Sequence, residues 1–199
     1  MKKLASFYDY IEIFVAAICA VLLLFALGVR LCRVDGHSMD NTLSDGQLLL
    51  TSDVFYTPKD GDIVVFHQSD NPISDLNKPL VKRVIATAGE WYKIVYCPDD
   101  ISYKMKVYVS ADDIFEENEL LNEDYIAYTA FPSSALFKNA TTDKDGNKIV
   151  IDKVPDGKIF VMGDNRYNSN DSRLGVGYVD ENCVVGRAIF SIMPFGGVK

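Results

Sequence analysis

The sequence predicts a mostly β protein in which an N-terminal transmembrane helix precedes an all-β domain. Two patterns carry this prediction. Residues 13–29 form an uncharged and almost entirely apolar run, as a membrane-spanning helix requires. After Arg33, short runs of β-branched, aromatic and aliphatic residues alternate with turn dipeptides such as Asp60-Gly61. Many short strands separated by frequent turns are typical of a β-barrel or a β-sandwich.

The run of residues 13–29 is at the short end of what a helix needs to cross a bilayer, about 17–25 residues. Arg30 and Arg33 follow it, and no small-residue cleavage pattern is present. We therefore expect an anchor that stays attached rather than a leader that is removed. Lys2 and Lys3 on one side nearly balance the two arginines on the other, so the positive-inside rule leaves the orientation undecided.

We expect two parts, an N-terminus with its anchor in residues 1–33 and one β-rich domain in residues 34–199. Strands are predicted at 47–50, 62–66, 80–87, 91–97, 105–109, 149–151, 159–162 and 183–192. A helix is predicted from Ser110, which can cap it, toward Leu121. Residues 110–147 have the character of an insertion, and the sequence assigns them no role.

The composition excludes several classes of function. The net charge is −8, which argues against nucleic acid as a partner because phosphate binding needs a basic face. Two histidines and no C-x-x-C pair predict neither a metal nor a cofactor. Cys19 and Cys32 lie in or beside the apolar run, whereas Cys97 and Cys183 lie in strand-like contexts. We expect buried thiols there, and a disulfide between these last two residues stays open.

A serine lies directly after the apolar run. From Arg33 to Ser38 an extended chain covers at most roughly 17 Å. Ser38 is therefore expected near the membrane surface, where a substrate anchored in the same bilayer could reach it. Serines in glycine-containing loops commonly serve only as caps or turn residues, so this position alone does not define a site.

A second candidate is Lys82, within an apolar run that is predicted to form a strand. Alternate residues of a strand face the same side, so Lys82 and Arg83 face opposite sides and one of the two cations lies on the more buried side. Such a lysine can extend its charged end to solvent. Alternatively it is desolvated, which lowers its pKa and yields a neutral amine that can act as a general base.

The third candidate segment, residues 163–173, holds two carboxylates, two arginines and two serines directly after an apolar strand. It is either a solvated loop or a hydrogen-bonding framework that holds a neighbouring catalytic group. A histidine partner for Ser38 also has to be weighed. The side chain of His37 diverges from that of its neighbour, whereas His67, after a predicted strand, leaves a Ser-His-Asp triad open.

Taken together, these segments resemble the conserved boxes of bacterial type I signal peptidases, the membrane-bound serine–lysine proteases that remove signal peptides from exported preproteins. The family's serine box, S-M-x-P-T, corresponds here to S-M-D-N-T at residues 38–42. Its lysine box, K-R-V-I-G-x-x-G-D, corresponds to K-R-V-I-A-T-A-G-E at residues 82–90. The box G-D-N-R-x-x-S-x-D-S-R is matched in full at residues 163–173.

The resemblance implies a role for each matched residue. Ser38 would be the nucleophile and its backbone N–H part of the oxyanion hole, and Lys82 would be the general base. Ser169 would orient the lysine amine, while Asp171 and Arg173 would form a structural ion pair. The resemblance also implies a single-pass cell-membrane protein with a cytoplasmic N-terminus and an outer catalytic domain of the signal-peptidase type. Its substrates would carry small residues one and three positions before the cut.

Several positions depart from the family pattern. Asn41 stands where the family has proline, so we expect a less rigid loop after the serine. Ala86 replaces a glycine, Glu90 replaces an aspartate, and Gly36 stands where some members have a serine that helps to bind the oxyanion.

Two other interpretations remain open. One is a catalytically inactive, membrane-anchored β-domain that only binds a partner. The intact Ser38, Lys82 and residues 163–173 argue against it, whereas the departures at Asn41 and Ala86 slightly favour it. The other is a different serine–lysine protease, such as the self-cleaving SOS repressors. Those carry a DNA-binding helix-turn-helix where this chain has its apolar run.

Overall fold

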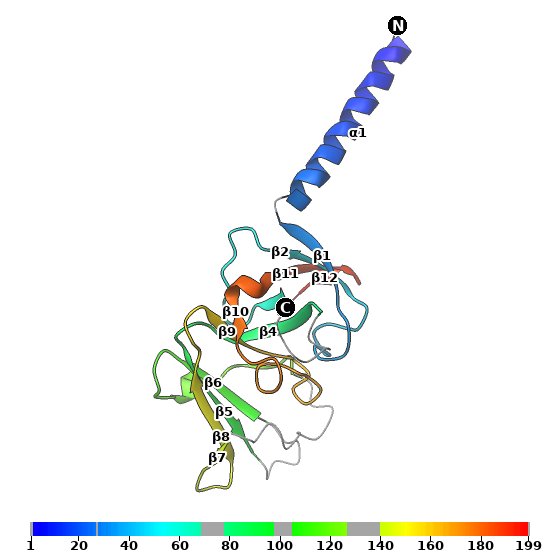
Figure 1. Cartoon of the computed structure of the whole chain (residues 1–199). Coiled ribbons are helices and arrows are strands. Elements are labelled where there is room, and N and C mark those ends of the chain that lie inside the picture. The colour runs from blue at the N-terminus through cyan, green and yellow to red at the C-terminus, as the bar shows by residue number, and fades with distance from the viewer. Residues whose placement is uncertain (1, 27, 69–77, 98–104, 127–139, 199) are drawn as a thin grey trace.

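A computed structural model describes residues 2–26, 28–68, 78–97, 105–126 and 140–198. The chain begins with helix α1 (Lys2–Ala26), which extends away from a β-rich body (Figure 1). No helix in these ranges combines the length and the apolar character needed to cross a membrane. The apolar run predicted over residues 13–29 is divided, because Gly28 takes a left-handed φ of 87° and Val29 already begins a strand. Glycine adopts such a φ without strain.

The larger of two sheets has eight strands in the order β1-β2-β11-β3-β4-β9-β10, with β12 paired to β11. Each strand runs antiparallel to its neighbours. The strands are β1 (Val29–Arg33), β2 (Leu48–Ser52), β3 (Ile63–Phe66), β4 (Leu80–Ala86), β9 (Lys158–Met162), β10 (Val179–Asp180), β11 (Val184–Met193) and β12 (Gly196–Gly197). Since β1 pairs with β2, the residues directly after α1 belong to this sheet.

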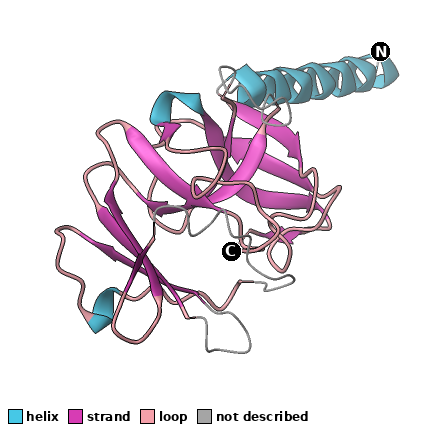
Figure 2. Cartoon of the chain, turned by 60° about the horizontal axis from the view of Figure 1, so that its bottom comes forward, coloured by secondary structure: helices cyan, strands magenta, loops and turns pink. Residues whose placement is uncertain are grey.

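The smaller sheet has the order β6-β5-β8-β7 and lies at the end of the body away from α1 (Figures 1 and 2). Its strands are β5 (Trp91–Tyr96), β6 (Met105–Ser110), β7 (Thr141–Thr142) and β8 (Lys148–Lys153). The two sheets share a core, in which the ring of Tyr92 on β5 stacks on that of Phe160 on β9 with centroids 4.0 Å apart. The predicted mostly β fold is therefore confirmed.

The helix predicted from Ser110 toward Leu121 is wrong. This stretch contains only a short 3-10 turn, Glu117–Glu119; a second such turn covers Glu181–Cys183. The Ser110 hydroxyl donates to the carbonyl oxygen of Ile114 at 3.0 Å, and the Asp112 carboxylate accepts from the Ile114 N–H at 2.9 Å. Short polar side chains that bond nearby backbone groups compete with helix formation in this way.

The core beneath the predicted catalytic serine belongs to the larger sheet. Met39 and Leu43 are buried against Leu49 of β2, Ile63 of β3 and Val81 of β4. Burial of these apolar side chains fixes the turn that carries Ser38 onto the sheet. No disulfide joins the two described cysteines Cys97 and Cys183, so the alternative pairing is wrong; both are thiols as predicted, but they are half-buried rather than buried.

Candidate active site

Ser38 lies in a compact turn that follows β1. The N–H groups of Thr42 and Leu43 both donate to the carbonyl oxygen of Met39, at 3.1 and 2.8 Å. Asn41 takes a φ of 79° within this turn. Asparagine enters the left-handed region more readily than most residues, whereas proline is locked near −65°. The absence of the family's proline at this position thus has a backbone explanation.

Lys82 lies on β4 and reaches the serine. Its Nζ donates to Ser38 Oγ at 2.7 Å and to the carbonyl oxygen of Val81 at 2.9 Å. The residue is only 3% exposed, so of the two readings of the sequence the structure shows the desolvated lysine. Both Lys82 and Arg83 are buried, because the sheet is covered on both of its faces at this strand.

The environment of Lys82 favours the neutral amine. Burial lowers the pKa of Lys82 from its ordinary value of 10.5 to about 8, and the positive charge of Lys78 acts in the same direction. The carboxylates of Asp171 and Asp164 oppose the shift. A buried amine within hydrogen-bond reach of a hydroxyl can accept that hydroxyl's proton once it is neutral.

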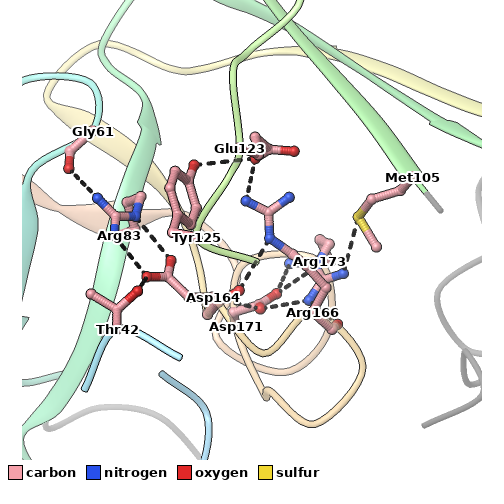
Figure 3. Close-up of polar contacts among 11 residues, drawn as sticks. Thr42, Gly61, Arg83, Met105, Glu123, Tyr125, Asp164, Arg166, Asp171 and Arg173 are labelled. Carbon is pink, nitrogen blue, oxygen red and sulfur yellow. Dashed lines mark hydrogen bonds and ion pairs between the residues drawn. The ribbon is translucent and has the colours of Figure 1, made fainter. Parts of the chain in front are cut away.

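The Arg83 side chain points to the other face of β4 and forms a bidentate ion pair with Asp164. Its Nε donates to Oδ1 at 2.9 Å and its Nη2 to Oδ2 at 2.7 Å, while Nη1 donates to the carbonyl oxygen of Gly61 at 2.8 Å. The Thr42 hydroxyl donates to the same carboxylate at 2.5 Å (Figure 3). Asp164 therefore connects the lysine strand to the serine turn.

Residues 163–173 form a loop directly after β9 in which Asp164, Arg166 and Asp171 are fully buried, whereas Asn168 and Asn170 are exposed. Arg173 donates from Nε and Nη2 to both oxygens of Asp171, at 2.9 and 2.8 Å, and the Gly163 N–H donates to Asp171 at 3.0 Å. Burial alone would raise the pKa of Asp171, but its pairing with Arg173 holds that pKa below its ordinary value. The loop is thus an ordered framework and not a solvated segment.

This framework contacts the serine turn through its backbone. The Asn165 N–H donates to the carbonyl oxygen of Ser38 at 3.0 Å, and Asn165 Nδ2 donates to that of His37 at 3.0 Å. A Cβ atom on Gly163 would overlap both the Ser38 carbonyl oxygen and the Ser169 hydroxyl. Only glycine allows the two segments to approach so closely.

Among the described residues, none of the remaining predicted groups forms a hydrogen bond with Ser38 Oγ or Lys82 Nζ. Ser169 Oγ is buried, and no described residue is within hydrogen-bond geometry of it, although the hydroxyl is near enough to lower the pKa of Asp171. The His37 ring contacts Asp40 at 3.4 Å. The His67 Nδ1 atom has no partner among the described residues. The structure thus brings Lys82, and neither histidine, to Ser38.

A pocket of about 210 Å³ opens beside the Ser38–Lys82 pair. Val34, Met39 and Leu80 line it together with the two polar residues. Asp35, which forms an ion pair with Lys78 just before β4, and Asn170 also line it. A cavity of mixed polar and apolar lining beside a reactive hydroxyl can receive a side chain of a bound peptide.

The sequence missed two residues that contact this framework. Glu123 pairs with the buried Arg166, and Tyr125 packs on Arg83 (Figure 3). Both lie in residues 110–147, to which the sequence assigned no role, and no motif or local pattern marks them. Arg83 and Asp164 lie inside the quoted boxes. Because a buried arginine needs an anionic partner, their ion pair could have been predicted from the sequence.

Comparisons with known proteins identify the family of this chain. The model of the family described as signal peptidase, peptidase S26, matches residues 7–193. Signal peptidase I of Bacillus licheniformis is 30% identical over 201 residues, which cover 100% of this chain and 95% of that relative. Signal peptidase IB of Staphylococcus aureus is 29% identical over 208 residues, with coverages of 100% and 95%.

A crystal structure of a signal peptidase I from Enterococcus faecalis is 25% identical, covers 66% of this chain and 97% of that one, and superimposes with a TM-score of 0.39. The family match over nearly the whole chain defines a peptidase, and hence a hydrolase. The chain belongs to the signal peptidase family, peptidase S26, and its curated relatives are type I enzymes of bacteria.

Proposed function

We propose that this signal peptidase removes N-terminal signal peptides from exported preproteins, with Ser38 as nucleophile and Lys82 as general base. The observation that carries the proposal is the 2.7 Å contact between Lys82 Nζ and Ser38 Oγ. Burial lowers the pKa of this lysine to about 8. A serine hydroxyl is a weak nucleophile until an adjacent base removes its proton.

The reaction then proceeds in two halves. As Ser38 Oγ attacks the carbonyl carbon of the scissile peptide, its proton passes to the neutral Lys82 amine. The resulting ammonium protonates the departing amine, which leaves an acyl ester on Ser38. A water molecule gives a proton to the amine, attacks the ester and restores the serine. The Val81 carbonyl oxygen, 2.9 Å from Nζ, holds the amine in place through both halves.

The oxyanion of each tetrahedral intermediate is assigned to the Ser38 backbone N–H, for which no described residue is a hydrogen-bond acceptor. Preorganised N–H donors of this kind stabilise the charge that develops on the carbonyl oxygen. Gly36 offers no side-chain donor, so this enzyme depends on the backbone more than members with a serine there. Ser169, within the framework, is proposed to orient the lysine amine, and the Asp171–Arg173 pair to support it.

The substrate is proposed to bind in an extended form along the start of β4. The pocket beside Ser38 would then receive the residue that precedes the cut. A volume of about 210 Å³ does not by itself require a small residue there, and a small side chain is expected from the family resemblance. A second small residue, three positions before the cut, is expected from the family resemblance.

We further propose that α1 attaches the domain to the cell membrane, with the N-terminus in the cytoplasm and the β-rich body on the outer face. Large apolar side chains are exposed along the helix, including Phe7, Ile13, Phe14, Leu22, Leu23 and Phe25, and an apolar environment would cover them. In this proposal the anchor ends with α1, and the catalytic domain begins with β1.

The test is cleavage of a model preprotein by the purified full chain. Wild-type protein should release the signal peptide, and Ser38→Ala should not, while circular dichroism shows both folded. His67→Ala is the matched control and should cleave normally. A folded wild-type protein that neither cleaves nor is acylated at Ser38 would instead support the inactive binding domain, and an inactive His67→Ala would revive the triad.

A further inference from the structure

One segment of the unassigned region crosses the catalytic framework. Residues 121–126, here called the brace, leave the smaller sheet and end against the serine turn. At one end the Leu121 N–H donates to the carbonyl oxygen of Val107 on β6 at 2.9 Å. At the other end the carbonyl oxygen of Ile126 accepts from Asn41 Nδ2 at 3.2 Å. The brace therefore joins the smaller sheet to the turn that carries Ser38.

Between these ends the brace contacts two buried arginines. Arg166 and Glu123 form an ion pair in which the side chains are 0% and 6% exposed. The Tyr125 ring lies against Arg83, with the guanidinium carbon 3.9 Å from the ring centroid, and Arg166 is 6.0 Å from the same centroid. The Tyr125 hydroxyl donates to Glu123 at 3.3 Å (Figure 3). The Tyr125 ring thus covers the face of the Arg83 guanidinium, while the edge of that guanidinium binds Asp164.

Both arginines lead directly to the reactive pair. Arg83 is the chain neighbour of Lys82, and its partner Asp164 also holds Thr42 at the end of the serine turn. Arg166 Nε donates to the carbonyl oxygen of Gly163 at 3.2 Å, in the loop whose backbone contacts Ser38. A displacement of either guanidinium would therefore change the position of both reactive groups.

We propose that the brace is a positioning element of the active site: Tyr125 and Glu123 hold Arg83 and Arg166 so that Ser38 and Lys82 stay at reacting distance. The proposal rests on the assignment of these two groups as nucleophile and base. No brace residue lines the pocket beside Ser38. Loss of the brace contacts should therefore lower kcat and leave KM nearly unchanged.

The chemistry of the contact sets which substitutions are tolerated. An aromatic face attracts a cation through its quadrupole and excludes water from it, which an aliphatic side chain of similar volume does only in part. The Tyr125 hydroxyl contributes one hydrogen bond to Glu123, longer than the ideal. Tyr125→Phe should therefore preserve the position of Arg83, whereas Tyr125→Leu should release it.

The experiment measures kcat and KM of Tyr125 variants on a peptide that spans a signal-peptide cleavage site. Tyr125→Leu is expected to lower kcat roughly 10- to 100-fold, the scale of a displacement of about 1 Å, with KM within about twofold of wild type. Tyr125→Phe should restore kcat to near the wild-type value. Phe115→Leu, which removes another ring near a cation but outside the brace, is the matched control and should keep kcat.

Thermal melting of each variant separates positioning from unfolding. If Tyr125→Leu does not fold, Tyr125→His, which keeps a planar ring, is measured in its place and should show an intermediate kcat. A folded Tyr125→Leu with wild-type kcat, or one in which only KM rises, overturns the proposal. Ser38→Ala runs in parallel: residual cleavage by that variant would refute the nucleophile, whatever Tyr125→Leu does.

Discussion

Replacement of Lys82 by methionine should abolish cleavage and at the same time stabilise the fold. Methionine keeps an unbranched chain but carries no titratable group. In the wild type, the pKa of Lys82 is near 8 in place of 10.5. At about 1.4 kcal/mol per pKa unit, the charged lysine therefore lowers the free energy of unfolding by roughly 3 kcal/mol. In the variant, the Val81 carbonyl oxygen and the Ser38 hydroxyl each lose a partner, at about 1 kcal/mol per hydrogen bond. The net gain is about 1 kcal/mol.

The sign of the pH dependence follows from the same shift. Below pH 8 both the folded and the unfolded chain carry the proton, so the cost of the buried charge is fully present. Between about pH 8 and 10.5 the unfolded chain binds the proton and the folded chain does not, so wild-type stability rises with pH in this window. Lys82→Met has no such group, and its advantage over the wild type should therefore shrink as the pH rises.

Two assays check this reasoning. Urea unfolding should show the methionine variant more stable than the wild type at pH 7 and no longer more stable at pH 10, because the wild type gains about 1.4 kcal/mol per pH unit between about pH 8 and pH 10. The kcat/KM of the wild type on a cleavage-site peptide should rise about tenfold per pH unit below pH 8 and level off above it. At pH 7 about one-tenth of the amine is neutral, some 300-fold more than at an unshifted pKa. A profile flat down to pH 5, an active Lys82→Arg, or a Lys82→Met less stable than wild type at pH 7 would refute it.

The other predictions concern the supports of the site. Asp171→Ala and Arg173→Ala should each lower the free energy of unfolding by roughly 3–5 kcal/mol, because each leaves its buried partner unpaired; thermal melting of both single variants and the double variant checks this, and small, additive losses would contradict it. Asn41→Pro should lower both the melting temperature and kcat, since proline cannot adopt a φ of 79°. Asn41→Gly should be tolerated. Equal melting temperatures for the two variants would show that the turn can change its backbone freely.

Much of the sheet architecture could be predicted from local pattern. The strand around Lys82 was predicted over 80–87 and is observed as β4, Leu80–Ala86, because apolar, β-branched residues bounded by turns have few alternatives to an extended form. The same local reasoning gave the wrong result from Ser110 onward. There the capping serine bonds within its own turn, and a cap without an apolar face behind it does not form a helix.

The reactive pair could be anticipated from the sequence, but its surroundings could not. Residues inside the matched boxes could be compared with a family pattern. For Glu123 and Tyr125 no pattern was available, because their partners are distant in the chain. Glu123 pairs with Arg166, 43 residues further on, and Tyr125 packs on Arg83 of β4 in the larger sheet. Contacts between distant segments depend on how the sheets pack, and no local periodicity encodes that packing.

The placement of two cations side by side on β4 has a consequence for insertions and deletions. A strand turns successive side chains to opposite faces, so a slip of one residue exchanges every inward and outward position. On this strand a slip of one residue would bring the permanently charged Arg83 to the place of Lys82 beside the serine and turn Lys82 to the opposite face. An insertion or deletion that shifts the register of β4 would therefore leave every amino acid of the boxes present and no proton acceptor at the hydroxyl. A search for missing catalytic residues would not detect the defect in such a protein.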